Sequence, residues 1–182
     1  SGTASVRMGR GIWTFRGSWS NTRTSANWIA GTGTVLFAST ASQPMTFAGF
    51  AGNEFYNVTF ASTASSGAVT FTMGTNALKW VGTLTIQDTA GSTTTLATAN
   101  LALAGGSLAI GNGGILTANG STVTVGDVTM TGGTSGLIAL TVGVWTVGGN
   151  WNTSGAGSSF MKGASTVTMV GAAKALQILN SA

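Results

Sequence analysis

Short segments with β-strand patterns recur along the whole chain. Eight of them alternate apolar and polar residues with a period of two and are rich in β-branched or aromatic residues: 34–37, 55–60, 68–71, 83–86, 100–103, 107–110, 122–125 and 166–169. From about residue 78 such phrases return every 7–10 residues, separated by clusters of Gly, Asn, Ser or Ala. Capped amphipathic helix patterns are nearly absent from the sequence. The chain is therefore predicted to be all-β.

The composition favours stacked coils over hairpins. Charged residues make up only 5% of the chain, against about a quarter in an average protein, so outward strand positions carry Thr, Ser and Ala. Hairpin dipeptides such as Asn112-Gly113 and Asn119-Gly120 are few. We predict a parallel β-helix or β-solenoid of about nine coils, taking roughly 20 residues per coil, and a rod of roughly 40–45 Å. An antiparallel β-sandwich is the alternative.

An internal repeat supports the solenoid. A shift of 132 positions aligns the two ends of the chain without a gap, with eight identities in 25 positions. Two of the identities are tryptophans, which makes chance a poor explanation. The identical pairs are Gly11/Gly143, Trp13/Trp145, Thr14/Thr146, Gly17/Gly149, Trp19/Trp151, Gly31/Gly163, Thr34/Thr166 and Val35/Val167. We expect one solenoid domain over 1–182, formed by a 132-residue unit, 1–132, and the first 50 residues of a second, 133–182.

The residues needed for most catalytic and metal sites are missing. The chain has no Cys and no His, and its only acids are Glu54, Asp88 and Asp127. A thiolate or imidazole mechanism, an ordinary zinc site and a disulfide framework are excluded. Asp88 and Asp127 could stack two coils apart, which would leave them about 10 Å from each other. We predict no enzymatic activity, no catalytic or metal-binding residues and no cofactor.

The positive charge is concentrated near the N-terminus. Four of the seven basic residues lie within the first 23 positions, and the rest of the chain sums to zero. This distribution does not support a nucleic-acid-binding face. The group is a candidate patch for an anionic partner, or simply a solvated end of the fold. Its members are Arg7, Arg10, Arg16 and Arg23.

Tryptophans suggest two different roles. In an extended chain Trp13, Phe15 and Trp19 share one face. We expect Trp13 and Trp145 to fill the core. Three others are candidates for stacking against a glycan, because amphipathic rings suit such contacts: Trp19, Trp28 and Trp151.

The N-terminal phrases resemble a known type of repeat. Met8-Gly-x-Gly-x-Trp13-Thr is followed by Gly31-Thr-Gly-Thr-Val35, by Thr46-Phe-Ala-Gly49 and by 55–60. This series over residues 8–60 is similar to repeats of large bacterial surface proteins and phage structural proteins, and it returns weakly at 140–179. The resemblance implies an adhesin-like or fibre-like β-solenoid and no enzymatic residue.

These features together predict a structural role. We expect a structural or adhesive component of an extracellular, cell-surface or virion-surface fibre, since open solenoid ends invite another strand. The expected partner is the chain itself, as a homo-oligomer, a filament or a continuation in a longer chain. The residues predicted to carry self-association are Ile12, Phe15, Leu176, Ile178 and Leu179. A carbohydrate-binding or receptor-binding module with surface glycans as partners is the alternative. No stretch of roughly 18 apolar residues is present, so no transmembrane helix is expected.

Overall fold

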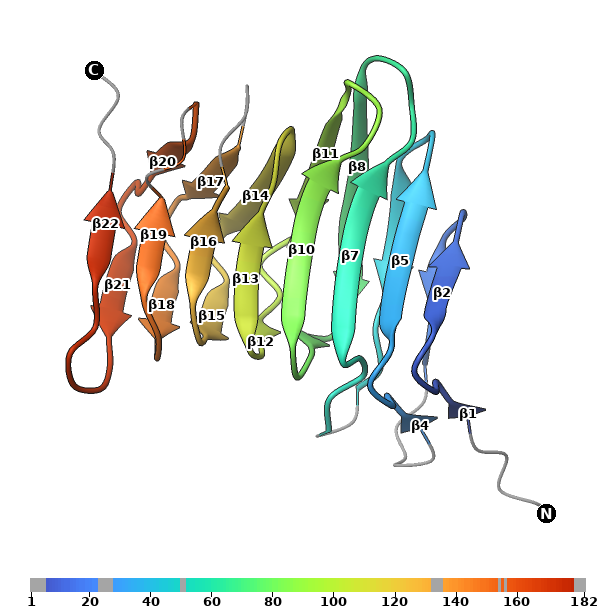
Figure 1. Ribbon diagram of the computed structural model, residues 1–182, viewed down its shortest axis with the longest axis horizontal. Coiled ribbons are helices and arrows are strands. Elements are labelled where there is room, and N and C mark those ends of the chain that lie inside the picture. Colours follow the sequence, from blue (N-terminus) through green and yellow to red (C-terminus); the bar gives the residue numbers. More distant parts are fainter. Residues whose placement is uncertain are drawn as a thin grey trace.

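The chain winds into a three-sided parallel β-solenoid (Figure 1). The computed structural model describes residues 6–22, 28–49, 52–131, 136–153, 155 and 157–178. Within these ranges it contains 22 strands and no helix, hence no helix that could cross a membrane. Every strand pair in them is parallel, as in Thr83–Ile86 against Ser107–Ile110. The predicted β-solenoid is confirmed, and the antiparallel sandwich is wrong.

Three parallel sheets form the sides of the solenoid. The largest has eight strands: β2 (Ile12–Phe15), β5 (Thr34–Ser39), β7 (Asn57–Ser62), β10 (Thr83–Asp88), β13 (Ser107–Ile110), β16 (Val128–Met130), β19 (Trp151–Thr153) and β22 (Leu176–Ile178). The second has seven: β3 (Trp19–Ser20), β6 (Gln43–Thr46), β8 (Ala68–Thr75), β11 (Thr93–Ala97), β14 (Gly114–Asn119), β17 (Leu137–Leu140) and β20 (Ser159–Met161). The third has five: β9 (Leu78–Lys79), β12 (Leu103–Ala104), β15 (Thr122–Val125), β18 (Val144–Val147) and β21 (Thr166–Met169). A two-stranded sheet, β1 (Val6–Arg7) with β4 (Trp28–Ile29), lies at the N-terminal end.

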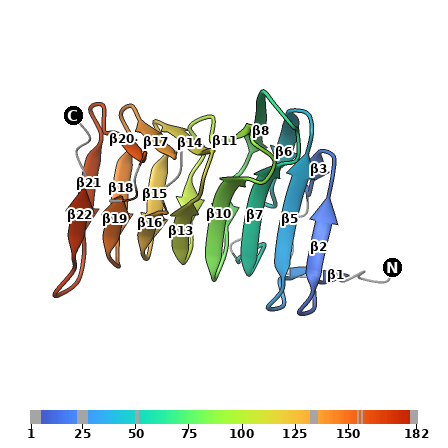
Figure 2. The same cartoon turned by 45° about the horizontal axis from the view of Figure 1, so that its top comes forward.

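The solenoid has fewer and longer coils than the sequence suggested. Eight strands in the largest sheet define about seven turns, which follow one another along the rod in Figure 2. Along this sheet the shortest coil leads from Leu108 to its partner Val128, and the longest leads from Val58 to its partner Leu84. The expectation of about nine coils took the length of the shortest coil for all of them. Seven spacings of about 4.8 Å give a stack roughly 34 Å long.

Residues that alternate inward form continuous columns inside the solenoid. Phe37 and Phe60 are register partners, and their rings stack with centroids 5.1 Å apart. The same column continues as Ile86, Ile110 and Met130, all buried. The core is thus aromatic near the N-terminus and aliphatic in the middle. Because each coil covers the inward side chains of the one before it, only the two ends of the columns lack a cover.

The sequence repeat is reproduced in the backbone. The amide of Thr34 donates to the carbonyl of Gly11, and the equivalent amide of Thr166 donates to the carbonyl of Gly143. Gly31 and Gly163 also share a positive φ, 63° and 54°. Their missing side chain is required, because a Cβ on Gly31 would meet the carbonyl oxygen of Met8. The sequence repeat is therefore also a repeat of local structure.

Successive units are nevertheless rotated about the solenoid axis. β2 lies on the eight-stranded sheet, whereas its equivalent β18 lies on the five-stranded sheet. Likewise β3 belongs to the seven-stranded sheet and its equivalent β19 to the eight-stranded one. The repeat thus covers five turns and two of the three faces of a sixth. Each unit begins one face away from where the previous unit began.

Candidate functional site

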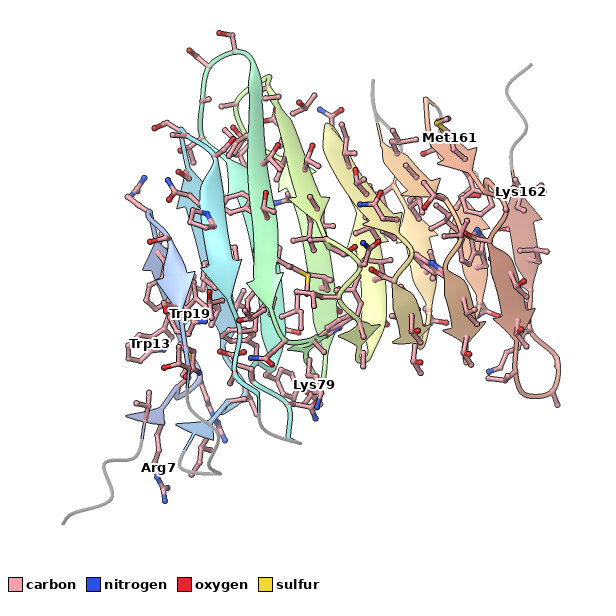
Figure 3. All side chains as sticks on the ribbon, turned by 180° about the vertical axis from the view of Figure 1, so that it is seen from behind. Arg7, Trp13, Trp19, Lys79, Met161 and Lys162 are labelled. Atoms are coloured by element: carbon pink, nitrogen blue, oxygen red, sulfur yellow. The ribbon has the colours of Figure 1, made fainter. Side chains whose placement is uncertain are left out.

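Among the described residues, none covers the core at the N-terminal end of the solenoid. Trp13 on β2 occupies an inward position, since its register partner is the buried Val35, yet it is 44% exposed. Ile12 beside it is 72% exposed. Phe15 is half-buried, with its ring centroid 4.8 Å from that of Trp19. In Figure 3, Trp13 and Trp19 lie at the same end of the molecule, opposite Met161 and Lys162.

The second unit shows what such a coil looks like when another coil precedes it. Trp145, the equivalent of Trp13, is fully buried (0% exposed) and lies in register between Val123 and Val167. A Cβ on Gly143 would come within 2.5 Å of the Ser121 carbonyl oxygen. At the equivalent Gly11 nothing lies within 4 Å of that position. The first coil therefore matches in sequence the coil around Trp145, which is covered on both sides, but no described residue covers the outer side of the first coil.

A buried carboxylate holds the N-terminal coils together. Oε1 of Glu54 accepts hydrogen bonds from Nε1 of Trp19 at 3.1 Å and Nδ2 of Asn21 at 2.8 Å. Oε2 accepts from the Ala48 amide at 2.9 Å. Burial raises the pKa of the Glu54 carboxyl above its ordinary 4.5, and these hydrogen bonds offset only part of that rise. In the sequence Glu54 is only one of three scattered acids, and nothing marks its role, because its partners Trp19 and Asn21 lie at distant positions in the chain.

No described residue covers the C-terminal end of the core either, and this end is hollowed. Leu176 (57% exposed) and Ile178 (49% exposed) occupy inward positions on β22, in register with Trp151 and Thr153. They border an apolar hollow of about 100 Å³, lined by Trp151, Phe160, Val167, Met169, Leu176 and Ile178. Leu179 lies outside the described residues. The described candidates for self-association therefore divide between the two ends: Ile12 and Phe15 at one, Leu176 and Ile178 at the other.

Comparisons with other proteins identify no relative. No family model, curated protein or solved structure matches this chain. The resemblance to bacterial surface and phage repeats stays a prediction.

The tryptophans predicted to stack on glycans have different environments. Trp151 is 1% exposed and packs edge-on against Trp145 and Phe160, with centroids 5.7 and 5.0 Å apart. The interpretation of Trp151 as a glycan platform is therefore wrong, because its side chain is almost fully buried against these two rings. Trp19 is half-buried and held by Glu54. Trp28 lies on β4, and its side chain is outside the described part of the chain.

The N-terminal arginines are at the surface. Arg7 on β1, Arg10 in the following turn and Arg16 after β2 are all exposed, in the first part of the rod (Figure 3 labels Arg7). Arg23 lies outside the described residues. Three of the four predicted members of an anionic-partner patch are thus accessible at the N-terminal end.

The aspartates do not stack. Asp88 is the last residue of β10 and Asp127 precedes β16, so they lie at opposite ends of strands in the eight-stranded sheet. The stacking that the sequence allowed is therefore not formed, because five strand positions, about 16 Å, separate them along the strand direction. Asp88 instead accepts hydrogen bonds from the amides of Ala90, Gly91 and Ser92. Burial opposes its ionisation, but these bonds and one from the Ser92 hydroxyl outweigh it and keep the pKa of Asp88 below 3.8.

Asp127 belongs to a ladder of side-chain caps that sequence reasoning missed. Its Oδ1 accepts from the Asn150 amide at 2.7 Å, and Oδ1 of Asn150 accepts from the Ala175 amide at 3.0 Å. Oδ1 of Asn57 makes the same kind of bond to the Thr83 amide. Each such residue satisfies a backbone donor one coil further along, at the corner where the eight-stranded sheet begins. These polar side chains therefore have a structural role.

Proposed function

We propose that this chain is a structural and adhesive element of an extracellular or virion-surface fibre that assembles by stacking its open solenoid ends. The observation that carries the proposal is the difference between two equivalent tryptophans. Trp13 is 44% exposed at the N-terminal end, whereas Trp145 is 0% exposed inside the stack. Another copy placed on β2 would remove the apolar surface of Trp13 from water, which is the main driving force for association.

The opposite end supplies a complementary surface. Leu176 and Ile178 continue inward columns, as Trp13 does, and β22 and β2 are the two edge strands of one sheet. Unpaired edge strands of this kind add further strands. Contact between β22 of one copy and β2 of the next gives a heterologous, head-to-tail arrangement, which produces filaments where the rotation does not close. The extracellular or virion setting rests on the resemblance of the N-terminal phrases to surface and phage repeats.

Sedimentation velocity across a concentration series tests this proposal. The wild-type chain is expected to increase in mass with concentration, and Trp13→Asp to stay monomeric, because the substitution puts a charge where the next copy would bury it. Val142→Asp is the matched control: Val142 is 67% exposed but lies in a turn between β17 and β18, on the side of the rod. A monomeric wild-type chain at every concentration, or equal assembly of Trp13→Asp and wild type, would overturn the proposal.

A further inference from the structure

In the first unit, Trp19 is covered by an acid and an aromatic residue that follow one another in sequence. Nε1 of Trp19 donates to Oε1 of Glu54, and the Trp19 and Phe55 ring centroids are 5.7 Å apart. Phe55 also contacts Phe37 and Phe47. The Glu54-Phe55 pair therefore closes the interior over Trp19 and satisfies its indole N–H at the same time.

Trp151, the equivalent of Trp19 in the second unit, has no such acid-aromatic pair beside it among the described residues. Its Nε1 is buried, and no described residue accepts a hydrogen bond from it. The ring lines the C-terminal hollow. A buried indole N–H without an acceptor is destabilising, because it has lost its hydrogen bond to water and gained none in return. Two things that Glu54 and Phe55 supply in the first unit are thus missing here: an acceptor for the indole N–H and an apolar side chain that fills the hollow.

Among the described residues, no strand pairs with the outer edge of β20 beside the hollow. β22 extends the eight-stranded sheet one coil beyond β20 and β21, the last strands of the other two sheets. β20 is an edge strand, and Phe160 at its centre lines the hollow. Met161, which ends it, is exposed. The repeat indicates the same place. Each element of the second unit lies one face away from its equivalent in the first, so a residue equivalent to Phe55 would lie on the seven-stranded sheet, next to β20.

We infer that this hollow binds an extended segment of another polypeptide that carries a carboxylate followed by an aromatic side chain. The segment adds to β20 as a parallel strand. Its carboxylate accepts the Trp151 indole N–H, and its ring fills the space between Phe160 and Met169. The inference rests on the proposed function, because both treat the open C-terminal end as a docking surface. It names the edge strand to which the segment adds, β20, and the two side chains by which the segment is recognised.

Synthetic peptides test the specificity of the site. The probe has the sequence of residues 52–58, Gly-Asn-Glu-Phe-Tyr-Asn-Val, and two variants carry Gln for Glu or Ala for Phe. Binding to the full chain is measured by titration calorimetry and by tryptophan fluorescence. The parent peptide is expected to bind at least tenfold more tightly than either variant, the Gln peptide because an acceptor charge is lost and the Ala peptide because the hollow stays empty. Equal affinity for all three peptides, or no binding by any, overturns the inference.

A pair of protein variants locates the site. Trp151→Phe keeps an aromatic ring and removes the N–H, so we expect the peptide affinity to fall about tenfold. Trp145→Phe is the matched control: its Nε1 also has no described acceptor, but Trp145 does not line the hollow. The control is expected to bind as the wild type does. Circular dichroism verifies that both variants fold. If Trp151→Phe does not fold, the comparison of the three peptides on the wild-type chain still tests the inference. Equal affinity loss in both variants contradicts the assignment.

The same experiments separate this inference from the proposed function. Peptide affinity is measured at a concentration where the chain is monomeric, so it does not depend on assembly. Selective peptide binding without assembly supports the inference and contradicts the proposed function. Assembly without selective peptide binding supports the proposed function and contradicts the inference.

Discussion

At the scale of single residues, Glu54 is the most consequential side chain that the solenoid buries. It accepts hydrogen bonds from two side chains of the first coil, Trp19 and Asn21, and from the amide of Ala48 in the second. Both carboxylate oxygens are used as acceptors. An amide in its place has only one oxygen, and its NH₂ group would face either Ala48 or the Trp19 and Asn21 donors.

Glu54→Gln is therefore expected to lower the free energy of unfolding by about 1–3 kcal/mol. Urea denaturation provides the measurement. Asp127→Asn is the matched acid-to-amide control, since Asn keeps the Oδ1 that accepts from the Asn150 amide. The control is expected to stay within about 0.5 kcal/mol of wild type. Equal losses in the two variants would show that the Glu54 contacts are not the cause.

The Glu54 carboxyl also predicts a pH dependence. Burial raises its pKa above 4.5. At pH values between the unfolded and the folded pKa, the folded chain therefore keeps a proton that the unfolded chain has lost. Its contribution to stability is complete below about 4.5 and declines as the pH rises through the folded pKa. The stability difference between wild type and Glu54→Gln is expected to narrow over that window and then remain constant. A difference that widens with pH would contradict the raised pKa.

At the scale of elements, the strand patterns in the sequence identify the strands well. The expected segments 34–37, 83–86 and 107–110 correspond to β5, β10 and β13, which begin at the same residues. The expected strand 100–103 is reduced to β12, Leu103–Ala104, because Ala99 and Asn100 adopt positive φ at a corner. Alternation thus predicts where a chain can be extended, while the corners decide where each strand starts.

Equivalent glycines in the two units provide a test of coil stacking. Gly143→Ala is expected to lower the free energy of unfolding by about 1–3 kcal/mol, since its Cβ would press against the Ser121 carbonyl oxygen. Gly11→Ala makes the same change where nothing lies within 4 Å, so the monomer should stay within about 0.5 kcal/mol of wild type. Chemical denaturation at low concentration measures both. Equal effects would mean that the preceding coil is not what distinguishes the two positions.

At the scale of the whole molecule, the repeat and the solenoid have different periods. One sequence unit covers five turns and two thirds of another, so equivalent strands such as β2 and β18 face different directions. Head-to-tail stacking joins the two edge strands of the eight-stranded sheet, β22 to β2, and continues that sheet into the next copy. The rod then grows along its axis, and its sides need not take part.

Electron microscopy of the purified chain tests this mode of growth. A single molecule is expected to measure about 34 Å along the axis, and each added copy to lengthen the rod by about 38 Å, eight strand spacings. Lengths should cluster at these steps, because whole molecules are added at the ends. Isolated short rods at all concentrations, or sheets formed by lateral contact, would contradict axial growth.

The sequence by itself determined the class of fold, the strands and the repeat. The alternation of apolar and polar residues in segments such as 83–86 and the low content of charged residues can be read from the chain without knowing which residues become neighbours in space. The candidate site was only partly predictable. Ile12, Phe15, Leu176 and Ile178 were recognised as residues of terminal strands, and they lie at the two ends.

Tertiary structure alone decided coil length, rotation and cover. Coil length depends on how much chain each corner uses, and it differs between the short coil from Leu108 to Val128 and the long coil from Val58 to Leu84. The difference between Trp13 and Trp145, identical residues in matching phrases, exists only because one has a coil on both sides. Glu54 became a central residue because the winding brings donors from distant positions to its two oxygens. Burial is a property of neighbours in space, and in a solenoid those neighbours are one coil away.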